Sequence, residues 1–294
     1  MKKIYFLFFA IFLNTCLISQ NNILIIDYNN AFTSDQNNNA SRIYNRLLAT
    51  QASVTRVASI PASISNVTYN QVWLFGNMGA PVAANLNPII NFMNGGGGVY
   101  VQSEVSCCNT QANYLDALIN ATVIAGGSIS HNTTYSNPYQ YTPNPNTICS
   151  STGSWSHYGN AVRPFIGVAA QNILFQITTT CSNLGVNNAG VQFRSCDLIS
   201  GQGALIGTGD INLFALNANC AGNSALNGNP NNNVVIDHIA NLFPALRNCS
   251  FGSPTGSAAW TNPSPICAAA GSINLSSLVT GTGGGTWSGT GVSG

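Results

Sequence analysis

The chain has 294 residues, of which 45% are hydrophobic and only 5% are charged. The length predicts one or two domains, and the hydrophobic content suffices for a folded core, which excludes a disordered chain. Eight Lys and Arg offset seven Asp and Glu, for a formal net charge of +1. Because the arginines are scattered and form no basic patch, we expect no nucleic-acid or anionic-membrane partner.

Residues 1–19 have the pattern of a secretory signal peptide. The basic start Met1-Lys2-Lys3 precedes the apolar run 4–13, which is shorter than the roughly 20 residues that a membrane-spanning helix needs. Ser19 supplies a small residue at the cleavage site, so we expect the mature chain to begin at Gln20. No later segment is long and apolar enough to predict membrane insertion. The sequence therefore predicts a protein that is secreted or displayed on the cell surface.

The cysteine content fits an oxidising compartment. Eight of the nine cysteines remain after Cys16 is removed with the signal peptide, and they contain no Cys-x-x-Cys pair. Zinc and redox motifs are therefore disfavoured, and disulfides are expected. The sequence does not reveal which cysteines pair.

The elements that follow the signal peptide alternate between strands and helices. Such alternation with short connections predicts a parallel sheet with right-handed crossovers. The stretch 126–159 breaks the pattern, and we interpret it as an irregular inserted segment held by Cys149. The predicted strands are 23–27, 54–57, 72–75, 99–101, 173–177, 192–193 and 204–207, and the predicted helices are 40–50, 84–94, 110–119 and 233–243.

The composition changes after Cys249, where Gly, Ser, Thr and Pro become frequent. We therefore predict an α/β domain over 20–250 and a linker over 251–264. Residues 265–294 have β character with glycine turns but are too few for a β-sandwich, which needs about 80 to 100 residues. We expect this tail to be the beginning of a truncated domain.

The order of elements in the α/β domain resembles the class I glutamine amidotransferase-like fold. Gly76-Asn77-Met78-Gly79 stands where amidotransferases carry their oxyanion-hole loop, and the run 96–104 resembles the approach to their nucleophile. The late run 207–214 resembles a Gly-Asp strand end that such domains share. The resemblance implies a flavodoxin-like sandwich, most similar to the noncatalytic branches of that superfamily.

The tail resembles the start of the Ig-like repeats in large surface proteins of gliding bacteria. The likeness is carried by Pro265-Ile266-Cys267, by 271–275 and by the glycine-rich run 283–292. Many such proteins are adhesins with a C-terminal sorting domain. The resemblance implies a bacterial surface protein that continues beyond Gly294 and in which Cys267 pairs with a later cysteine.

Three of the seven mature carboxylates, Asp27, Glu104 and Asp210, stand at the carboxyl ends of predicted strands. Ligands of open α/β sheets bind beyond those ends, so we predict a polar crevice there that also includes Gly76, Asn77 and Gly79. Such a crevice suits a sugar hydroxyl, a peptide amine or a hard cation such as calcium. The same acids would alternatively accept hydrogen bonds from loop and helix-start N–H groups. Apart from such a calcium ion, no metal site or cofactor is implied.

Cys107 and Cys108 lie close to the position of the amidotransferase nucleophile. The Gly-x-Cys-x-Gly elbow and the His-x-Glu partner of that family are absent, which favours disulfide use of these cysteines. A catalytic Cys108 or Glu104 therefore remains a secondary hypothesis.

Three functions stay open at this point. The leading one is an exported recognition or adhesion protein whose noncatalytic domain binds a glycan or a protein. The second is an extracellular hydrolase that uses the strand-end carboxylates or Cys108. The third is a structural stalk module without a ligand.

Overall fold

The computed structural model describes residues 21–28, 39–76, 86–103, 109–132, 138–143, 155–156, 164–180, 187–209 and 231–249. The chain divides into two compact units, Met1–Phe251 and Gly252–Gly294. The expected signal peptide, linker and Ig-like repeat all lie outside the described residues.

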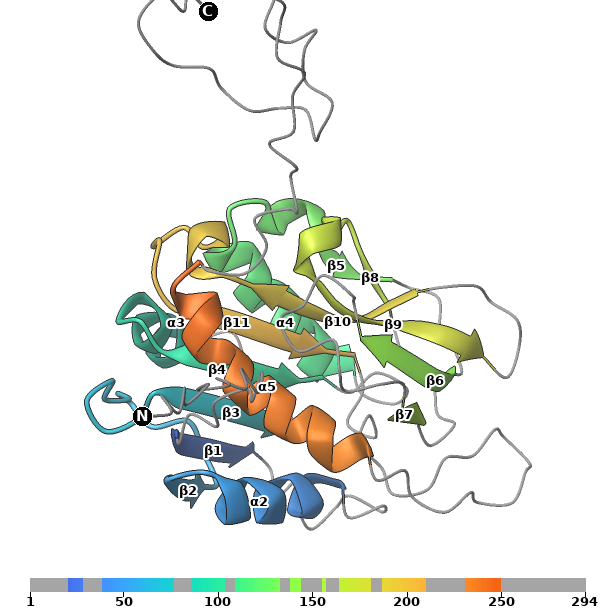
Figure 1. Cartoon of the computed structure of the whole chain (residues 1–294). Coiled ribbons are helices and arrows are strands. Elements are labelled where there is room, and N and C mark those ends of the chain that lie inside the picture. The colour runs from blue at the N-terminus through green and yellow to red at the C-terminus, as the bar shows by residue number, and fades with distance from the viewer. Residues whose placement is uncertain are drawn as a thin grey trace, which may run out of the picture. The chain divides into compact units, whose positions relative to one another are not determined.

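Five parallel strands form one half of the central sheet of the α/β unit (Figure 1). Its strands stand in the order β2-β1-β3-β4-β11, and every neighbouring pair is parallel. This is the strand order of flavodoxin-like sheets. The predicted α/β fold around a parallel sheet is therefore confirmed for this half. The strands are β1 (Asn22–Tyr28), β2 (Ser53–Val57), β3 (Gln71–Gly76), β4 (Gly98–Gln102) and β11 (Ala204–Thr208).

The second half of the sheet is antiparallel, so the expectation of an all-parallel sheet is wrong here. The order continues from β11 through β10, β9 and β6 to β7, with each pair antiparallel. Only six residues separate the end of β9 from the start of β10, and a connection that short joins antiparallel strands, because a parallel crossover needs a dozen or more residues. These strands are β10 (Asn187–Phe193), β9 (Ile173–Thr180), β6 (Pro138–Pro143) and β7 (Trp155–Ser156).

The segment 126–159 is more regular than its sequence suggests. It contains β6 and β7, and also β5 (Ser130–His131), which pairs with β8 (Phe165–Ile166). β6 is framed by Pro138 and Pro143 and finds its partner β9 much later in the chain. A local pattern therefore could not reveal it. Cys149, the expected anchor of this segment, lies outside the described residues.

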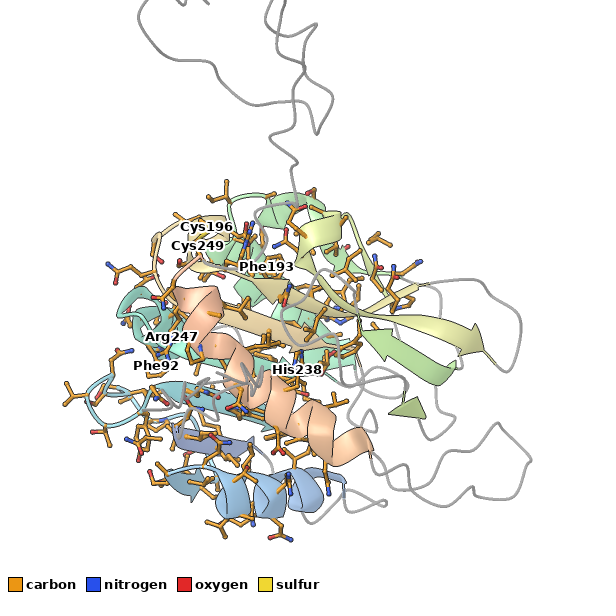
Figure 2. The ribbon with its side chains drawn as sticks, viewed as in Figure 1. Phe92, Phe193, Cys196, His238, Arg247 and Cys249 are labelled. Atoms are coloured by element: carbon orange, nitrogen blue, oxygen red, sulfur yellow. A yellow bond between two sulfur atoms is a disulfide. The ribbon has the colours of Figure 1, made fainter. Side chains whose placement is uncertain are left out.

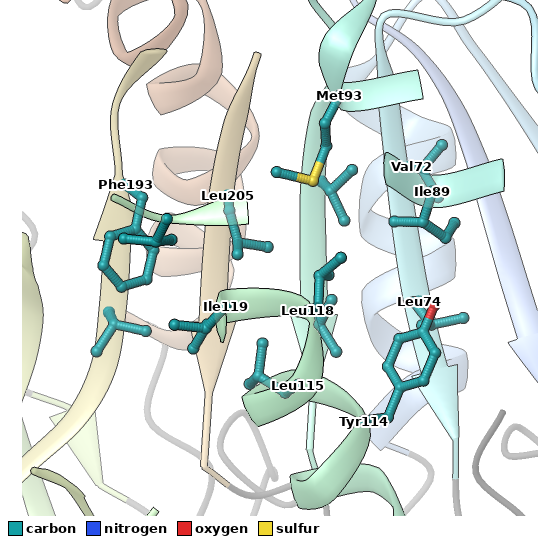
Figure 3. Close-up of a cluster of buried hydrophobic side chains, with 14 of the residues drawn as sticks. Val72, Leu74, Ile89, Met93, Tyr114, Leu115, Leu118, Ile119, Phe193 and Leu205 are labelled. Carbon is teal, nitrogen blue, oxygen red and sulfur yellow. The ribbon is translucent and has the colours of Figure 1, made fainter. Parts of the chain in front are cut away.

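Helices cover both faces of the sheet. α2 (Asn39–Thr50) and α5 (Asn231–Arg247) pack on one face, and α3 (Leu86–Asn94) and α4 (Asn109–Thr122) pack on the other. Successive strand residues alternate between the faces, as a pleated strand requires. In β1, Ile23 and Ile25 pack in the layer under α2 and α5. Leu24 and Ile26 point to the other face and join the layer under α3 and α4, part of which Figure 3 shows.

The glycine run after α3 ends that helix and lets α5 approach the sheet. Gly96 has a φ of +93°, the left-handed conformation expected at a helix end. A Cβ atom on Gly98 would lie 2.4 Å from the Phe243 ring, so any larger residue would push α5 away from β4.

A disulfide joins Cys196 to Cys249 across 53 positions of sequence (Figure 2). It ties the end of α5 to the short turn Ser195–Asp197 that follows β10. This pairing supports the expectation that cysteines form disulfides. The remaining mature cysteines lie outside the described residues.

His238 is a buried histidine on α5 whose ring nitrogens both lack a hydrogen-bond partner. Burial lowers its pKa to about 4, below the ordinary value of 6.5. His238 thus occupies a packed position of the helix. Since the charged form is penalised only in the folded state, stability is complete above pH 6.5 and falls as the pH drops from 6.5 towards 4.

We predict that His238→Leu flattens this pH dependence. The change removes an unpartnered buried imidazole, and the wild-type loss between pH 6.5 and 4 is about 3 kcal/mol. Urea unfolding at pH 7, 5.5 and 4.5 measures the effect, with Asn45→Leu at an exposed position of α2 as the control. An equally steep acid loss in His238→Leu would show that other groups control it.

Candidate functional site

The carboxyl ends of the parallel strands meet at one edge of the sheet. Tyr28 at the end of β1 pairs with Gly76 at the end of β3, and Gln102 at the end of β4 pairs with Thr208 at the end of β11. We call this the carboxyl edge. The strand order reverses between β1 and β3, and such a reversal is where open α/β sheets bind ligands.

The structure places only part of the predicted crevice. Asp27 and Gly76 lie at the carboxyl edge, on adjacent strands. Asn77, Gly79, Glu104, Cys108 and Asp210 lie outside the described residues. Whether all these groups share one crevice therefore stays a prediction.

Asp27 is engaged in an ion pair inside the fold. Its carboxylate accepts hydrogen bonds from the Arg56 guanidinium on β2, with 3.0 Å between Nε and Oδ2. The Asp27 side chain is 2% exposed and that of Arg56 is 37% exposed. The Arg56 guanidinium also lies 6.0 Å from the centre of the Tyr44 ring. Removing one partner of a pair buried in this way leaves an uncompensated charge. Asp27 therefore stabilises the fold at the carboxyl edge as well as lining that edge.

A second polar group at the same edge was not predicted from the sequence. Ser103 directly follows β4, and its Oγ lies 3.2 Å from Nε2 of His131 on β5. Nδ1 of His131 lies 2.7 Å from Oδ1 of Asp116 on α4. The backbone N–H of His131 also donates to the Asp116 carboxylate, and its ring packs 4.2 Å from that of Phe165. Three elements thus bring a hydroxyl, an imidazole and a carboxylate into one chain.

This order of groups is the one that serine hydrolases use, where the acid orients the histidine and the histidine accepts the serine proton. Its exposure is the reverse of theirs. Ser103 is fully buried, whereas the Asp116 side chain is 25% exposed. The Ser103 hydroxyl also donates to the backbone oxygen of Thr208 at 2.6 Å, and the Ser103 N–H donates to the same oxygen at 2.9 Å. In the described state the group links β4, α4, β5 and β11.

Sequence reasoning passed over this group for an identifiable reason. The acids were weighed by their place at strand ends, and Asp116 stands in the middle of a helix. His131 stands near Tyr135 and Tyr139 in the sequence, a setting typical of aromatic packing, and its ring does pack against that of Phe165. A polar residue directly after a buried strand, as Ser103 is, was the available signal.

The described residues contain no group of three or more His, Cys, Asp or Glu side chains that could hold a metal ion. The calcium hypothesis rests on Asp27, Glu104 and Asp210, and only the first of these is described. It is therefore carried forward as part of the proposal below.

Comparisons with known proteins give only distant structural likeness. No protein-family model matches the chain, and no curated protein matches it significantly. The N-terminal domain of mmIFT52 is 14% identical and aligns over 66% of this chain and 87% of its own, with a TM-score of 0.46. A ThuA-like protein from Bacteroides uniformis is 12% identical over 74% of this chain and 89% of its own, with a TM-score of 0.43. The β-galactosidase of Rahnella sp. R3 is 13% identical over 80% of this chain and 32% of its own, with a TM-score of 0.45. At these values no function is transferred to this chain.

Proposed function

We propose that the chain is an exported cell-surface recognition protein whose α/β domain binds a glycan or a protein at the carboxyl edge. The observation that carries the proposal is the strand order β2-β1-β3-β4-β11, whose reversal lies between β1 and β3. Tyr28 and Gly76 end these two strands side by side, so whatever binds at the reversal meets both. Asn77, Gly79, Glu104 and Asp210 complete the crevice in this proposal, and calcium is a candidate bound ion.

Export is supported by the signal-peptide pattern and by the disulfide between Cys196 and Cys249, a bond that persists in oxidising compartments. No helix in the described ranges is both long and apolar enough to cross a membrane. The proposal further assigns the tail 265–294 to the first of several Ig-like repeats. Those repeats would hold the α/β domain away from the surface of a bacterial cell.

A glycan array probed with the secreted protein tests the recognition function. We predict that Glu104→Ala and Asp210→Ala each weaken binding at least about tenfold, because each removes a charged acceptor of sugar hydroxyls or a calcium ligand. Asp237→Asn is the matched control, since it also removes a carboxylate but lies on α5, in the ion pair with Arg46. Binding that is unaffected by both edge variants, or weakened equally by the control, contradicts the proposal.

A serine hydrolase is the second candidate, and the Ser103–His131–Asp116 distances favour it. In that function His131 would take the Ser103 proton through Nε2 while Asp116 holds the Nδ1 side. The hydroxyl would first have to turn from the Thr208 oxygen towards His131. The burial of Ser103 opposes this function, because a nucleophile must reach its substrate.

Labelling with a fluorophosphonate probe separates the two candidates. We predict that the native protein remains unlabelled at Ser103, because its hydroxyl is buried and already donates a hydrogen bond to the Thr208 backbone oxygen. Peptide mapping by mass spectrometry reads the result, and Ser103→Ala identifies the background. Labelling that disappears in Ser103→Ala would instead establish a hydrolase.

A further inference from the structure

Arg247 differs from the other arginines whose side chains the structure describes. Arg46, Arg56 and Arg194 each form an ion pair with an aspartate. Arg247, the last residue of α5, has no carboxylate partner among the described residues. Its hydrogen-bond acceptors are backbone oxygens at 3.4 to 3.5 Å, those of Phe243, Asn70 and Gly96. Charge-assisted hydrogen bonds measure about 2.7 to 2.9 Å, so the donors of Arg247 are weakly used.

The pKa values follow the same division. The hydrogen bonds that Arg46 donates to Asp237, and Arg194 to Asp197, raise the pKa of these two guanidinium groups. Burial lowers the pKa of Arg247, and no carboxylate among the described residues offsets that effect. Arg247 is thus a partly desolvated cation whose counter-charge the described residues do not supply. An anion that entered from solvent would provide it.

A cavity of about 380 Å³ lies beside Arg247. This volume falls within the range of about 300 to 1,000 Å³ that small-molecule sites occupy. Space above its glycines is open, since a Cβ atom on Gly96 or Gly201 would meet no atom within 4 Å. The cavity is lined by Gly96, Gly201, Gln202, Gly203, Pro244, Arg247 and Asn248.

The walls of this cavity are held in place by backbone constraints. Gly96, Gly201 and Gly203 have φ values of +93°, +66° and +78°, which fix the turns before β4 and β11. The disulfide ties Cys249, two residues beyond Arg247, to the turn at Cys196 that leads towards Gly201. A site whose walls are fixed before binding loses less entropy when a ligand arrives.

We propose that this cavity binds the carboxylate group of a small ligand, with the Arg247 guanidinium as its charged partner. Arg247 is the one charged group among the lining residues that the structure describes, so a monoanion balances it and a phosphate dianion would leave an excess charge. The amides of Gln202 and Asn248 can meet hydroxyl or amide groups on the rest of the ligand.

This site is independent of the proposed recognition function. Gly96 and Gly203 precede the first residues of β4 and β11, so the cavity lies at the amino edge of the sheet, opposite the carboxyl edge. Two ligand classes carry the required chemistry, sugar acids and N-acylated amino acids, and the carboxylate is common to both.

Isothermal titration calorimetry on the full chain tests the proposal with four probes. Galacturonate and N-acetylalanine carry the carboxylate, and galactose and N-acetylalanine amide are their neutral counterparts. We predict that at least one carboxylate binds at least about tenfold more tightly than its neutral counterpart, and that added salt weakens it. Binding of galacturonate alone identifies a sugar-acid site, and binding of both acids identifies a general carboxylate site. Absence of carboxylate binding, or equal binding of the neutral counterparts, overturns the proposal.

Variants then locate the site. Arg247→Gln should lower the affinity at least about tenfold, and Arg247→Lys less, because it keeps the charge but loses the planar fork. Arg46→Gln is the control, since it removes an arginine that already has a partner. Unchanged affinity in Arg247→Gln overturns the proposal. Amide chemical shifts of the wild-type protein give a readout that needs no variant. Titration with the carboxylate must shift the amide resonances of Gly96, Gly201 and Gly203. Shifts confined to other residues also overturn the proposal.

Discussion

The parallel pairing of β11 with β4 is the contact on which most of the molecule depends. Residues 98–102 and 204–208 pair in register, so the chain from Ser103 to Gly203 must end beside the strand from which it started. That return closes the parallel half and begins the antiparallel half, because β10 pairs with the free side of β11. It also places Thr208 against Ser103 at the carboxyl edge, and Gly203 next to the Gly97 backbone at the amino edge. The Ser103–His131–Asp116 group and the cavity beside Arg247 therefore both depend on this pairing.

The chain has few charged residues, and most of those that the structure describes are paired with one another. Each of the four aspartate side chains that the structure describes has a basic side chain as its partner: Asp27 has Arg56, Asp116 has His131, Asp197 has Arg194 and Asp237 has Arg46. These pairs join elements that are distant in sequence or fix a turn, so charge acts here as an internal connector. A group outside this scheme becomes informative for that reason. Arg247 is such a group, and an external anion is the simplest completion of its surroundings.

Sequence patterns were sufficient to predict those elements whose formation depends mainly on neighbouring residues. Apolar runs such as 23–27 and 72–75, and the glycines after α3, predicted elements that the structure describes close to the expected positions. They failed where the deciding partner is distant: β6 depends on β9, and the direction of β9 and β10 depends on β11. The site followed the same rule. Asp27 could be placed at a strand end, but its partner Arg56 and the Ser103–His131–Asp116 group exist only once separate elements meet.

Native-state hydrogen exchange on the secreted protein tests the central pairing most directly. The amides of Val99–Val101 and Leu205–Gly207 should exchange only through global unfolding, with free energies of opening equal within about 1 kcal/mol. That result means that β4 and β11 belong to one cooperative unit. Exchange of the β11 amides at a free energy several kcal/mol below that of β4 would contradict the account, because the segment from Ser103 to Gly203 could then detach while the first four parallel strands remain folded.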